Sequence, residues 1–233
     1  TLPKILGLPF IDPLRSLHAR NAASFRDPRL VQLFDRYATY NGSNPWRTPA
    51  TMGIIPHVEY EWGGWTVLEG IHAIPRALER VARELGVEFR YGARVERILT
   101  DGRNAVGAAW VDAGGRRGEV RADAVVSDLD VLATWREMLN APESKAARRY
   151  ARLEPSSSGV VFYWGIKRRD GRLGVNNIFF STDYAAEFRD IFDEGRLPDD
   201  PTVYVNITGR VTAGDAPPDG DNWFVLVSAP PDR

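Results

Sequence analysis

Two segments decide the fold of this chain: GGWTVLEGIHAIPRALERVARELGVEFRYGARVERI (residues 63–98) and ADAVVSDLD (residues 122–130). After the opening glycines, apolar residues recur at helical spacing and line one helical face: Ile74, Leu78, Val81 and Leu85. Pro75 is tolerated only in a first turn, and Gly86 is a typical stop for a helix. The pattern therefore predicts an amphipathic helix within residues 70–86.

The remainder of this region has turn-forming residues at intervals that are typical of short strands. Residues 87–99 predict two strands broken at their glycine, and the pair Asp101-Gly102 predicts a tight turn. A second turn is expected over residues 113–118, AGGRRG. Residues 122–126 are short, apolar and β-branched, which is typical of a strand buried on both faces. The whole region is expected to be a segment of a nucleotide-binding domain.

A helix is also expected before this region. Asp27 is a suitable N-cap, Pro28 fits the first helical position, and Gly42 ends a run of apolar residues at helical spacing. The following residues 43–50 are rich in turn formers, and they lead into an apolar segment over residues 52–58.

The last hundred residues have a different character. Two helical stretches are expected first, over residues 131–139 and 143–153. Strand-like runs separated by Gly, Asp and Pro turns then predict a mostly antiparallel sheet, at residues 159–166, 177–180, 202–207 and 223–228. A helix is expected within this sheet region, at residues 184–192. The fold class is therefore a mixture of α/β and α+β elements.

Composition excludes several classes of function. The chain has 233 residues, 30 basic and 31 acidic side chains and a net charge of -1, so it lacks the positive field that nucleic-acid binding needs. It has no cysteine, which excludes disulfides and thiolate metal sites. No apolar run approaches the roughly 18 residues of a membrane span. Because it begins at Thr1 and ends directly after a strand-like run, we expect a piece of a longer protein.

Few residues suggest acid–base chemistry. The three histidines, His18, His57 and His72, match no metal-binding spacing. His57 and Glu59 would share one face if their segment were a strand, but an isolated polar pair near a turn is an equally ordinary interpretation. Asp12 and Arg15 are spaced to form an ion pair, and solvated surface charges have the same pattern.

Phosphate and acyl-transfer motifs are missing from the sequence. Gly114, Gly115 and Gly118 lie between two expected strands, not between a strand and a helix, so they lack the helix N-terminus of a pyrophosphate-binding loop. Ser156–Ser158 does not form the GxSxG motif of a nucleophile elbow. The abundant aromatic residues indicate either an ordinary core or an apolar cleft. The residues alone do not identify an activity.

Several long strings nevertheless resemble one family, the bacterial-type phytoene desaturases and related carotenoid dehydrogenases. The strings are FRDPRLVQLFDRYATYNGSNPWRTPATMGIIPHVE (25–59), GIHAIPRALERVARELGVEFRYGARVERI (70–98), ADAVVSDLD (122–130), NNIFFSTDYAAEFRDIF (176–192) and DPTVYVNITGRVTAGDAPPDGDNWFVLVSAP (200–230). Their order and spacing also match, and the resemblance covers nearly the whole chain.

The resemblance implies part of an FAD-binding, Rossmann-like domain of the GR2 type, together with a substrate domain. Residues 1–62 and 131–233 would form the substrate domain, and residues 63–130 would be the middle segment of the FAD domain. The dinucleotide fingerprint and the second FAD motif of the family lie near the termini of its members and are missing here. We therefore expect residues 1–233 alone not to retain FAD.

Some FAD contacts of the family transfer to matching positions. Val95 occupies the position whose backbone meets the adenine portion, and Ser127, Asp128 and Asp130 occupy the strand end near the cofactor. Gly70 corresponds to a glycine before the first helix of the FAD domain. Family members commonly carry a second glycine where this chain has Glu69, so a side chain here occupies space that glycine leaves open for close approach of the backbone to FAD.

The implied activity is dehydrogenation of an apolar polyene, phytoene or a related carotenoid, by hydride transfer to FAD. Alternatives are a carotenoid isomerase, saturase or oxygenase, or a non-catalytic fragment that binds a hydrophobic ligand. If an acid or base assists, the candidates are Asp12, Arg15, His57 and Glu59. Because the substrate dissolves in lipid, the resemblance implies a cytoplasmic protein that touches the membrane surface without spanning it.

Overall fold

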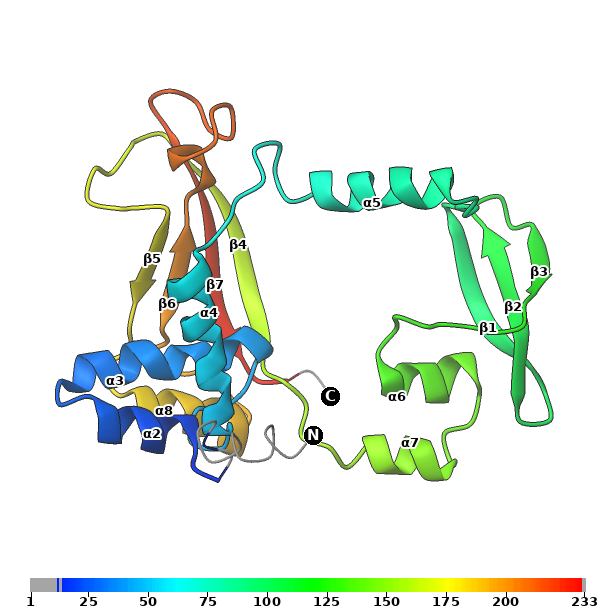
Figure 1. The fold of residues 1–233 in the computed structure, drawn as a ribbon, viewed down its shortest axis with the longest axis horizontal. Helices are drawn as coiled ribbons and strands as arrows, with labels where there is room; N and C mark the ends of the chain where they lie inside the picture. Colours follow the sequence, from blue (N-terminus) through cyan, green and yellow to red (C-terminus); the bar gives the residue numbers. More distant parts are fainter. Residues whose placement is uncertain (1–11, 13, 232–233) are drawn as a thin grey trace. The chain divides into compact units, whose positions relative to one another are not determined.

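Figure 1 shows a computed structural model of the chain, which describes residue 12 and residues 14–231. The chain folds as two compact units. Unit 1 contains the residues up to Ala73 together with those from Pro155 onward, and unit 2 contains Ile74–Glu154. The assignment of residues 1–62, 63–130 and 131–233 to substrate and FAD domains stays a prediction.

The helices of unit 1 begin where the sequence provides capping side chains. α2 (Leu17–Ser24) is capped by the hydroxyl of Ser16, and α3 (Pro28–Asp35) by the carboxylate of Asp27. Pro28 occupies the start of α3, as predicted. The helix continues as a 3₁₀ turn, η2 (Arg36–Asn41), and ends at Gly42 with φ of 63°.

Three further helical segments belong to unit 1. The 3₁₀ turn η3 (Ala50–Gly53) leads directly into α4 (Ile54–Trp62). α8 (Tyr184–Arg189) is capped by the carboxylate of Asp183 and continues into a π-helical turn, η5 (Asp190–Glu194). A short 3₁₀ turn, η6 (Thr208–Arg210), lies between the last two strands.

The sheet of unit 1 confirms the predicted antiparallel arrangement. Its strands are β4 (Ser158–Ile166), β5 (Asn176–Phe179), β6 (Val203–Asn206) and β7 (Asp221–Ala229). Their order is β4-β7-β6-β5, and all three pairings are antiparallel. β7, the last of these strands in the sequence, therefore lies between β4 and β6 (Figure 1).

The core of unit 1 forms on this sheet. Val205, Ile207 and Val225 are buried and pack with Leu173, Val203 and Trp223. A second anchor is polar: the buried Glu187 of α8 accepts hydrogen bonds from Ser181 Oγ at 2.7 Å and from Thr202 Oγ1 at 2.6 Å. These bonds fix α8 to the ends of two strands and satisfy a carboxylate that would otherwise be costly to bury.

Unit 2 contains the predicted amphipathic helix as α5 (Ala73–Glu84, whose first residue is assigned to unit 1) and a sheet of β1 (Ala93–Asp101), β2 (Asn104–Asp112) and β3 (Arg117–Arg121). Both predicted turns are confirmed, because β1–β2 and β2–β3 are antiparallel hairpins. The chain continues through α6 (Val131–Ala133), the π-helical turn η4 (Thr134–Met138) and α7 (Lys145–Tyr150).

Two predictions about strands are wrong. Residues 87–90 form no strand, so only the second half of the predicted pair exists as β1. Residues 122–126 are also not a strand. Ala122 N donates to Val106 O of β2 at 3.1 Å, but the pairing of β3 with β2 ends at Arg121, and Val126 is 96% exposed. Residues 52–58, expected only as an apolar segment, belong to η3 and α4, so the condition under which His57 and Glu59 would share the face of a strand is not met.

Candidate functional site

One pocket in unit 1 lies against its sheet and has a volume of about 710 Å³. Ile178 of β5, Tyr204 of β6 and Leu226 of β7 line it from the sheet. Leu33, Tyr37 and Tyr40 of the α3–η2 segment and Glu59 of α4 line it from the helices. Polar residues also line the pocket: Arg36, Thr39, Ser156, Ser157, Ser158, Asn176 and Ser228. A cavity of this volume, with aliphatic and aromatic walls beside polar groups, can hold a small molecule.

Glu59 is held in this pocket by two tyrosines. Tyr37 Oη donates to Glu59 Oε2 at 2.7 Å, and Tyr40 Oη donates to Glu59 Oε1. The two rings stack with centroids 5.5 Å apart. The tyrosines are three residues apart on a helical turn, which places both hydroxyls on the side that faces α4. Both carboxylate oxygens of Glu59 therefore have a fixed direction.

The phenols of this cluster stay protonated over the physiological pH range. Burial, followed by the hydrogen bond to Glu59, raises the pKa of Tyr40 to about 12. The same two causes raise the pKa of Tyr37 well above its usual range. Both hydroxyls therefore act as donors to the Glu59 carboxylate.

Arg36 and Tyr204 form a second polar pair at the pocket. The guanidinium of Arg36 lies over the ring of Tyr204, 5.8 Å from its centroid. Tyr204 Oη donates to Asn176 Oδ1 at 2.7 Å. These contacts fix the orientation of an aromatic ring that lines the wall of the pocket.

The pocket also depends on a close contact between distant parts of the chain. Ser157 N donates to Gly42 O at 2.8 Å, and a Cβ on Gly42 would lie 2.8 Å from Ser156 Cβ. Gly42 is therefore required both by its positive φ and by the lack of space. The serines serve this backbone junction, in line with their lack of a nucleophile motif.

The four candidate acid–base residues are not brought together. Asp12 and Arg15 form an ion pair, with Arg15 Nη2 2.6 Å from Asp12 Oδ2, and hydrogen bonding to Arg15 lowers the pKa of Asp12. Neither residue lines the pocket. His57 and Glu59 are two apart on helix α4, so they do not share a face, and His57 is exposed. Among these four candidates only Glu59 lies in the pocket, and all four roles stay predictions.

Sequence reasoning missed four members of this pocket: Tyr37, Tyr40, Arg36 and Tyr204. Tyr37 lies on the apolar face of the predicted helix, and Tyr40 follows it by one helical turn. This spacing of two tyrosines was the signal in the sequence that could have indicated a shared site. Tyr204 and Arg36 had none, because their contact joins a strand and a helix far apart in the sequence.

The residues predicted to contact FAD are distributed over both units. Gly70 belongs to unit 1 and has φ of 80°, so its turn requires glycine for the backbone conformation alone. Val95 lies in β1 beside a register shift that leaves Glu96 out of the pairing with β2. Such a bulge frees backbone groups, which fits a contact made by the backbone at this position.

The predicted strand end of unit 2 is an extended, exposed segment. Asp130 Oδ1 accepts from Leu132 N at 2.8 Å and from Ala133 N at 3.0 Å, which caps α6. Ser127 Oγ lies 3.1 Å from Thr134 Oγ1, and Asp128 is exposed. Exposed hydroxyl and carboxylate groups at this position fit the polar parts of a dinucleotide. The FAD roles of Val95, Ser127, Asp128, Asp130 and Gly70 stay predictions.

Two other groups of functional residues can be assessed in the described part of the chain. Its helices include none with the length and apolarity needed to cross a bilayer. Residue 12 and residues 14–231 also hold no group of three or more His, Cys, Asp or Glu side chains arranged to bind a metal ion. Gly114, Gly115 and Gly118 lie in and beside the β2–β3 turn, as predicted, and the ring of Trp110 packs on Gly118.

Comparison with known proteins identifies the family to which the chain belongs. Residues 13–216 match the model of the flavin containing amine oxidoreductases, so the chain belongs to this family of flavin-dependent oxidoreductases. A flavin cofactor follows from this membership, and FAD is its usual form in carotenoid desaturases.

Curated relatives narrow the resemblance further. The chain is 40% identical over 232 residues to a 1-hydroxycarotenoid 3,4-desaturase of Flavobacterium sp. (strain P99-3), covering all of this chain and 46% of that protein. It is 40% identical over 230 residues to the zeta-carotene-forming phytoene desaturase of Myxococcus xanthus, covering 98% of this chain and 43% of that protein. A 4,4'-diapolycopene oxygenase of Methylomonas sp is 35% identical over 208 residues, covering 88% of this chain and 40% of that protein. The chain thus spans less than half the length of these relatives.

Proposed function

We propose that this chain is part of an FAD-dependent carotenoid desaturase that removes two hydrogens from an apolar polyene. Similarity to two desaturases, each 40% identical, supports the substrate class. The observation that carries the proposal is the pocket on the sheet of unit 1, in which aliphatic and aromatic side chains lie beside polar ones and one carboxylate, Glu59, is fixed by two donors.

The chemistry divides between the cofactor and the pocket. When bound, the flavin would supply the acceptor for a hydride, which departs with the electron pair of its C–H bond and leaves one carbon of the polyene electron-deficient. A proton must then leave the adjacent carbon, so that its bonding electrons form the new double bond. A carbon next to an electron-deficient centre is acidic, so a weak base is sufficient.

Glu59 is the proposed proton acceptor in this pocket. Its carboxylate is oriented by Tyr37 and Tyr40, which hold it in one position without protonating it. The aromatic walls orient the polyene and exclude water. Val95, Ser127, Asp128, Asp130 and Gly70 are proposed contacts to FAD.

The activity test uses the complete gene product that contains this chain, with FAD and phytoene in liposomes. Desaturation lengthens the conjugated system, so the polyene absorbance moves to longer wavelength. If the absorbance spectrum of the polyene does not change while the protein is folded and FAD is bound, desaturation of phytoene is excluded. Similarity to an oxygenase supports oxygenation as the second candidate, and the mass of the product separates the two: loss of hydrogen or gain of oxygen.

Glu59→Gln tests the proton acceptor. We expect the rate to fall about 100-fold or more, because a positioned base contributes roughly 10²–10⁴-fold. Glu61→Gln is the matched control, since Glu61 is an exposed carboxylate on the same helix that does not line the pocket, and this change is expected to leave the rate unchanged. Equal rates for Glu59→Gln and the original protein would show that the proton leaves to another group.

We also propose that the protein is cytoplasmic and binds the membrane surface peripherally. A lipid-soluble substrate requires access to the bilayer, and the exposed aromatic residues Tyr60, Trp62 and Trp65 at the end of α4 support this proposal. Co-flotation with liposomes would test it, and a Trp62→Ser/Trp65→Ser variant is expected to bind less. Unchanged flotation of this variant would remove these residues from the contact.

A further inference from the structure

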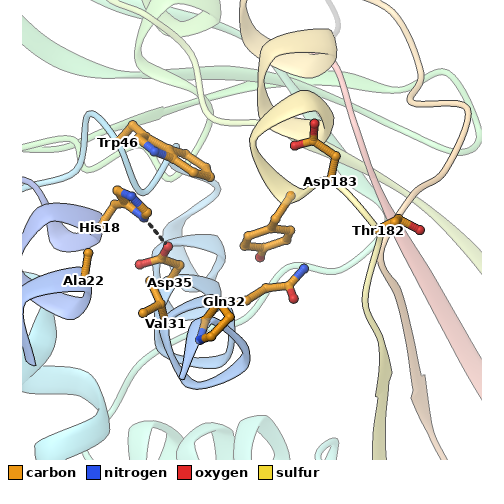
Figure 2. Close-up of a pocket in the computed structure, with 10 residues that line it drawn as sticks. His18, Ala22, Val31, Gln32, Asp35, Trp46, Thr182 and Asp183 are labelled. Carbon is orange, nitrogen blue, oxygen red and sulfur yellow. Dashed lines mark hydrogen bonds and ion pairs between the residues drawn. The ribbon is translucent and has the colours of Figure 1, made fainter. Parts of the chain in front are cut away.

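A second pocket of unit 1, about 510 Å³ in volume, contains polar groups that the desaturation chemistry does not use. It lies between α2, α3 and the start of α8, and Figure 2 shows His18, Asp35 and Trp46 on one side, with Thr182 and Asp183 across from them. The first pocket uses Leu33, Arg36 and Tyr37, which lie on a different face of the α3–η2 segment from Val31, Gln32 and Asp35.

His18 is fixed in two directions. Its Nδ1 lies 2.7 Å from Asp35 Oδ2, and its ring stacks on Trp46 with centroids 4.7 Å apart (Figure 2). Asp35 is 1% exposed, and Asn21 Nδ2 donates to its other oxygen at 2.8 Å. Both oxygens of Asp35 are therefore occupied, and this residue positions His18 without reaching a ligand itself.

The other ring nitrogen of His18 is available. Whichever partner carries the shared proton, Nδ1 is engaged with Asp35 and Nε2 faces away from it. No hydrogen bond joins Nε2 to any residue in the described part of the chain, and the side chain is 32% exposed. A role in joining α2 to α3 does not need this nitrogen, because Asn21 already makes that connection.

Tyr184 supplies an independent observation in the same pocket. It is 7% exposed, and within the described residues its hydroxyl makes no hydrogen bond of standard geometry, although the guanidinium of Arg36 lies near enough to lower its pKa. A buried hydroxyl without a partner is unfavourable, so a ligand oxygen would satisfy it. Burial raises the pKa of this phenol far more than nearby Arg36 lowers it, so the group stays protonated and can donate.

The lining of the pocket defines the class of ligand. Its walls include Ala22, Pro28, Val31 and the ring of Trp46, and no lysine or arginine lines it, which disfavours an anion. Asp35 is engaged with two donors, and the carboxylate of Asp183 caps α8 through Ala186 N, which leaves little to hold a cation. An uncharged, mostly apolar molecule with one hydroxyl fits best, because a hydroxyl can donate to His18 Nε2 and accept from Tyr184 Oη.

From this arrangement we infer that the second pocket binds the hydroxylated end of an isoprenoid, with His18 and Tyr184 as its specificity-determining residues. The inference rests on the proposed function for the identity of the substrate, and one relative is described as a desaturase of 1-hydroxycarotenoids. A polyene whose end is a plain hydrocarbon would leave both groups without a partner.

The test compares two polyenes in the complete FAD-loaded protein, one with a hydroxyl on its terminal isoprene unit and one without. His18→Asn keeps a donor to Asp35 and removes Nε2, whereas Tyr184→Phe keeps the ring and removes only the hydroxyl. Each variant is expected to lower kcat/KM for the hydroxylated polyene about tenfold, the effect of one ordinary hydrogen bond, and to leave the hydrocarbon unchanged. His72→Asn is the control, because His72 is exposed and lines neither pocket.

Equal effects on the two polyenes, or no effect on either, would overturn the inference. If the protein converts neither polyene, the proposed function fails, and the pocket is tested by binding alone. Linalool, a tertiary isoprenoid alcohol, and its hydrocarbon counterpart myrcene are then titrated while the fluorescence of Trp46 is followed, with Trp46→Phe as a blank. Preference for linalool that both variants abolish supports the site, and equal binding of the two molecules contradicts it.

Discussion

The two units of this protein differ in how their secondary structure is supported. In unit 1, helices and sheet enclose buried side chains such as Ile207, Val225 and Phe188. In unit 2, all of whose residues are described, only Gly107 and Ala147 are buried. The apolar face of α5 is exposed, with Leu78 at 65% and Val81 at 49%. Hairpins and helical turns thus form from local sequence in both units, but a hydrophobic core forms only where distant segments meet.

The largest expected difference concerns the cores themselves. Ile207→Ala removes a side chain with no exposure, and we expect it to lower the free energy of unfolding by about 2–5 kcal/mol. Leu78→Ala in α5 is the counterpart, with an expected change of about 0.5 kcal/mol or less, because the side chain is already in water. Urea unfolding followed by circular dichroism measures both. A large loss for Leu78→Ala would show that the α5 face is covered in solution.

A smaller difference in stability between the units is expected for substitutions at glycines with positive φ. Gly42→Ala is expected to destabilise unit 1 by more than the roughly 1–2 kcal/mol of the left-handed conformation, because the new Cβ would lie 2.8 Å from Ser156 Cβ. Gly102→Ala in the β1–β2 turn of unit 2 has a similar φ, 58°, and open space around it, so only the conformational cost applies. Equal losses in the two urea titrations would argue against a tight junction at Gly42.

The smallest expected effect is a change in the pKa of a tyrosine, and one tyrosine from each unit is compared. Tyr40 has a folded pKa of about 12, above the usual value of 10.0, so its contribution to stability is complete below pH 10 and is lost as the pH rises toward 12. In Glu59→Gln the pKa of Tyr40 should fall, because one of its two main causes is removed. Tyr91 of unit 2, whose pKa is raised chiefly by its hydrogen bond to Glu79, should not respond.

Absorbance at alkaline pH follows these titrations, with Tyr40→Phe and Tyr91→Phe to assign the signals. An unchanged Tyr40 titration in Glu59→Gln would contradict the hydrogen bond between these residues.

Much of the fold follows from local sequence patterns. The cap Asp27, the proline after it and Gly42 predict the segment that forms α3 and η2, and the four antiparallel strands of unit 1 lie close to their predicted positions. The strand expected over residues 122–126 is absent, because an apolar run becomes a strand only beside a partner, and the sequence does not state whether that partner is present.

The sites were less predictable than the fold. Glu59 was a candidate from sequence, but the tyrosines that hold it come from a different helix. The second pocket joins His18 to Asp35, 17 residues away, and places both near Tyr184, whose contacts depend on the packing of α8. Such groupings follow from tertiary packing, and no spacing rule in a single sequence encodes them.

The position of β7 has a consequence for synthesis of the protein on the ribosome. Unit 1 begins with the first helices, yet its central strand, Asp221–Ala229, is translated after every other strand of the sheet. Until these residues leave the exit tunnel, β4 has no neighbour in the sheet and its aromatic side chains, including Phe162 and Trp164, have no strand beside them. A nascent chain halted before residue 221 is therefore expected to depend on chaperones, whereas the β1–β3 hairpins can form as soon as they emerge.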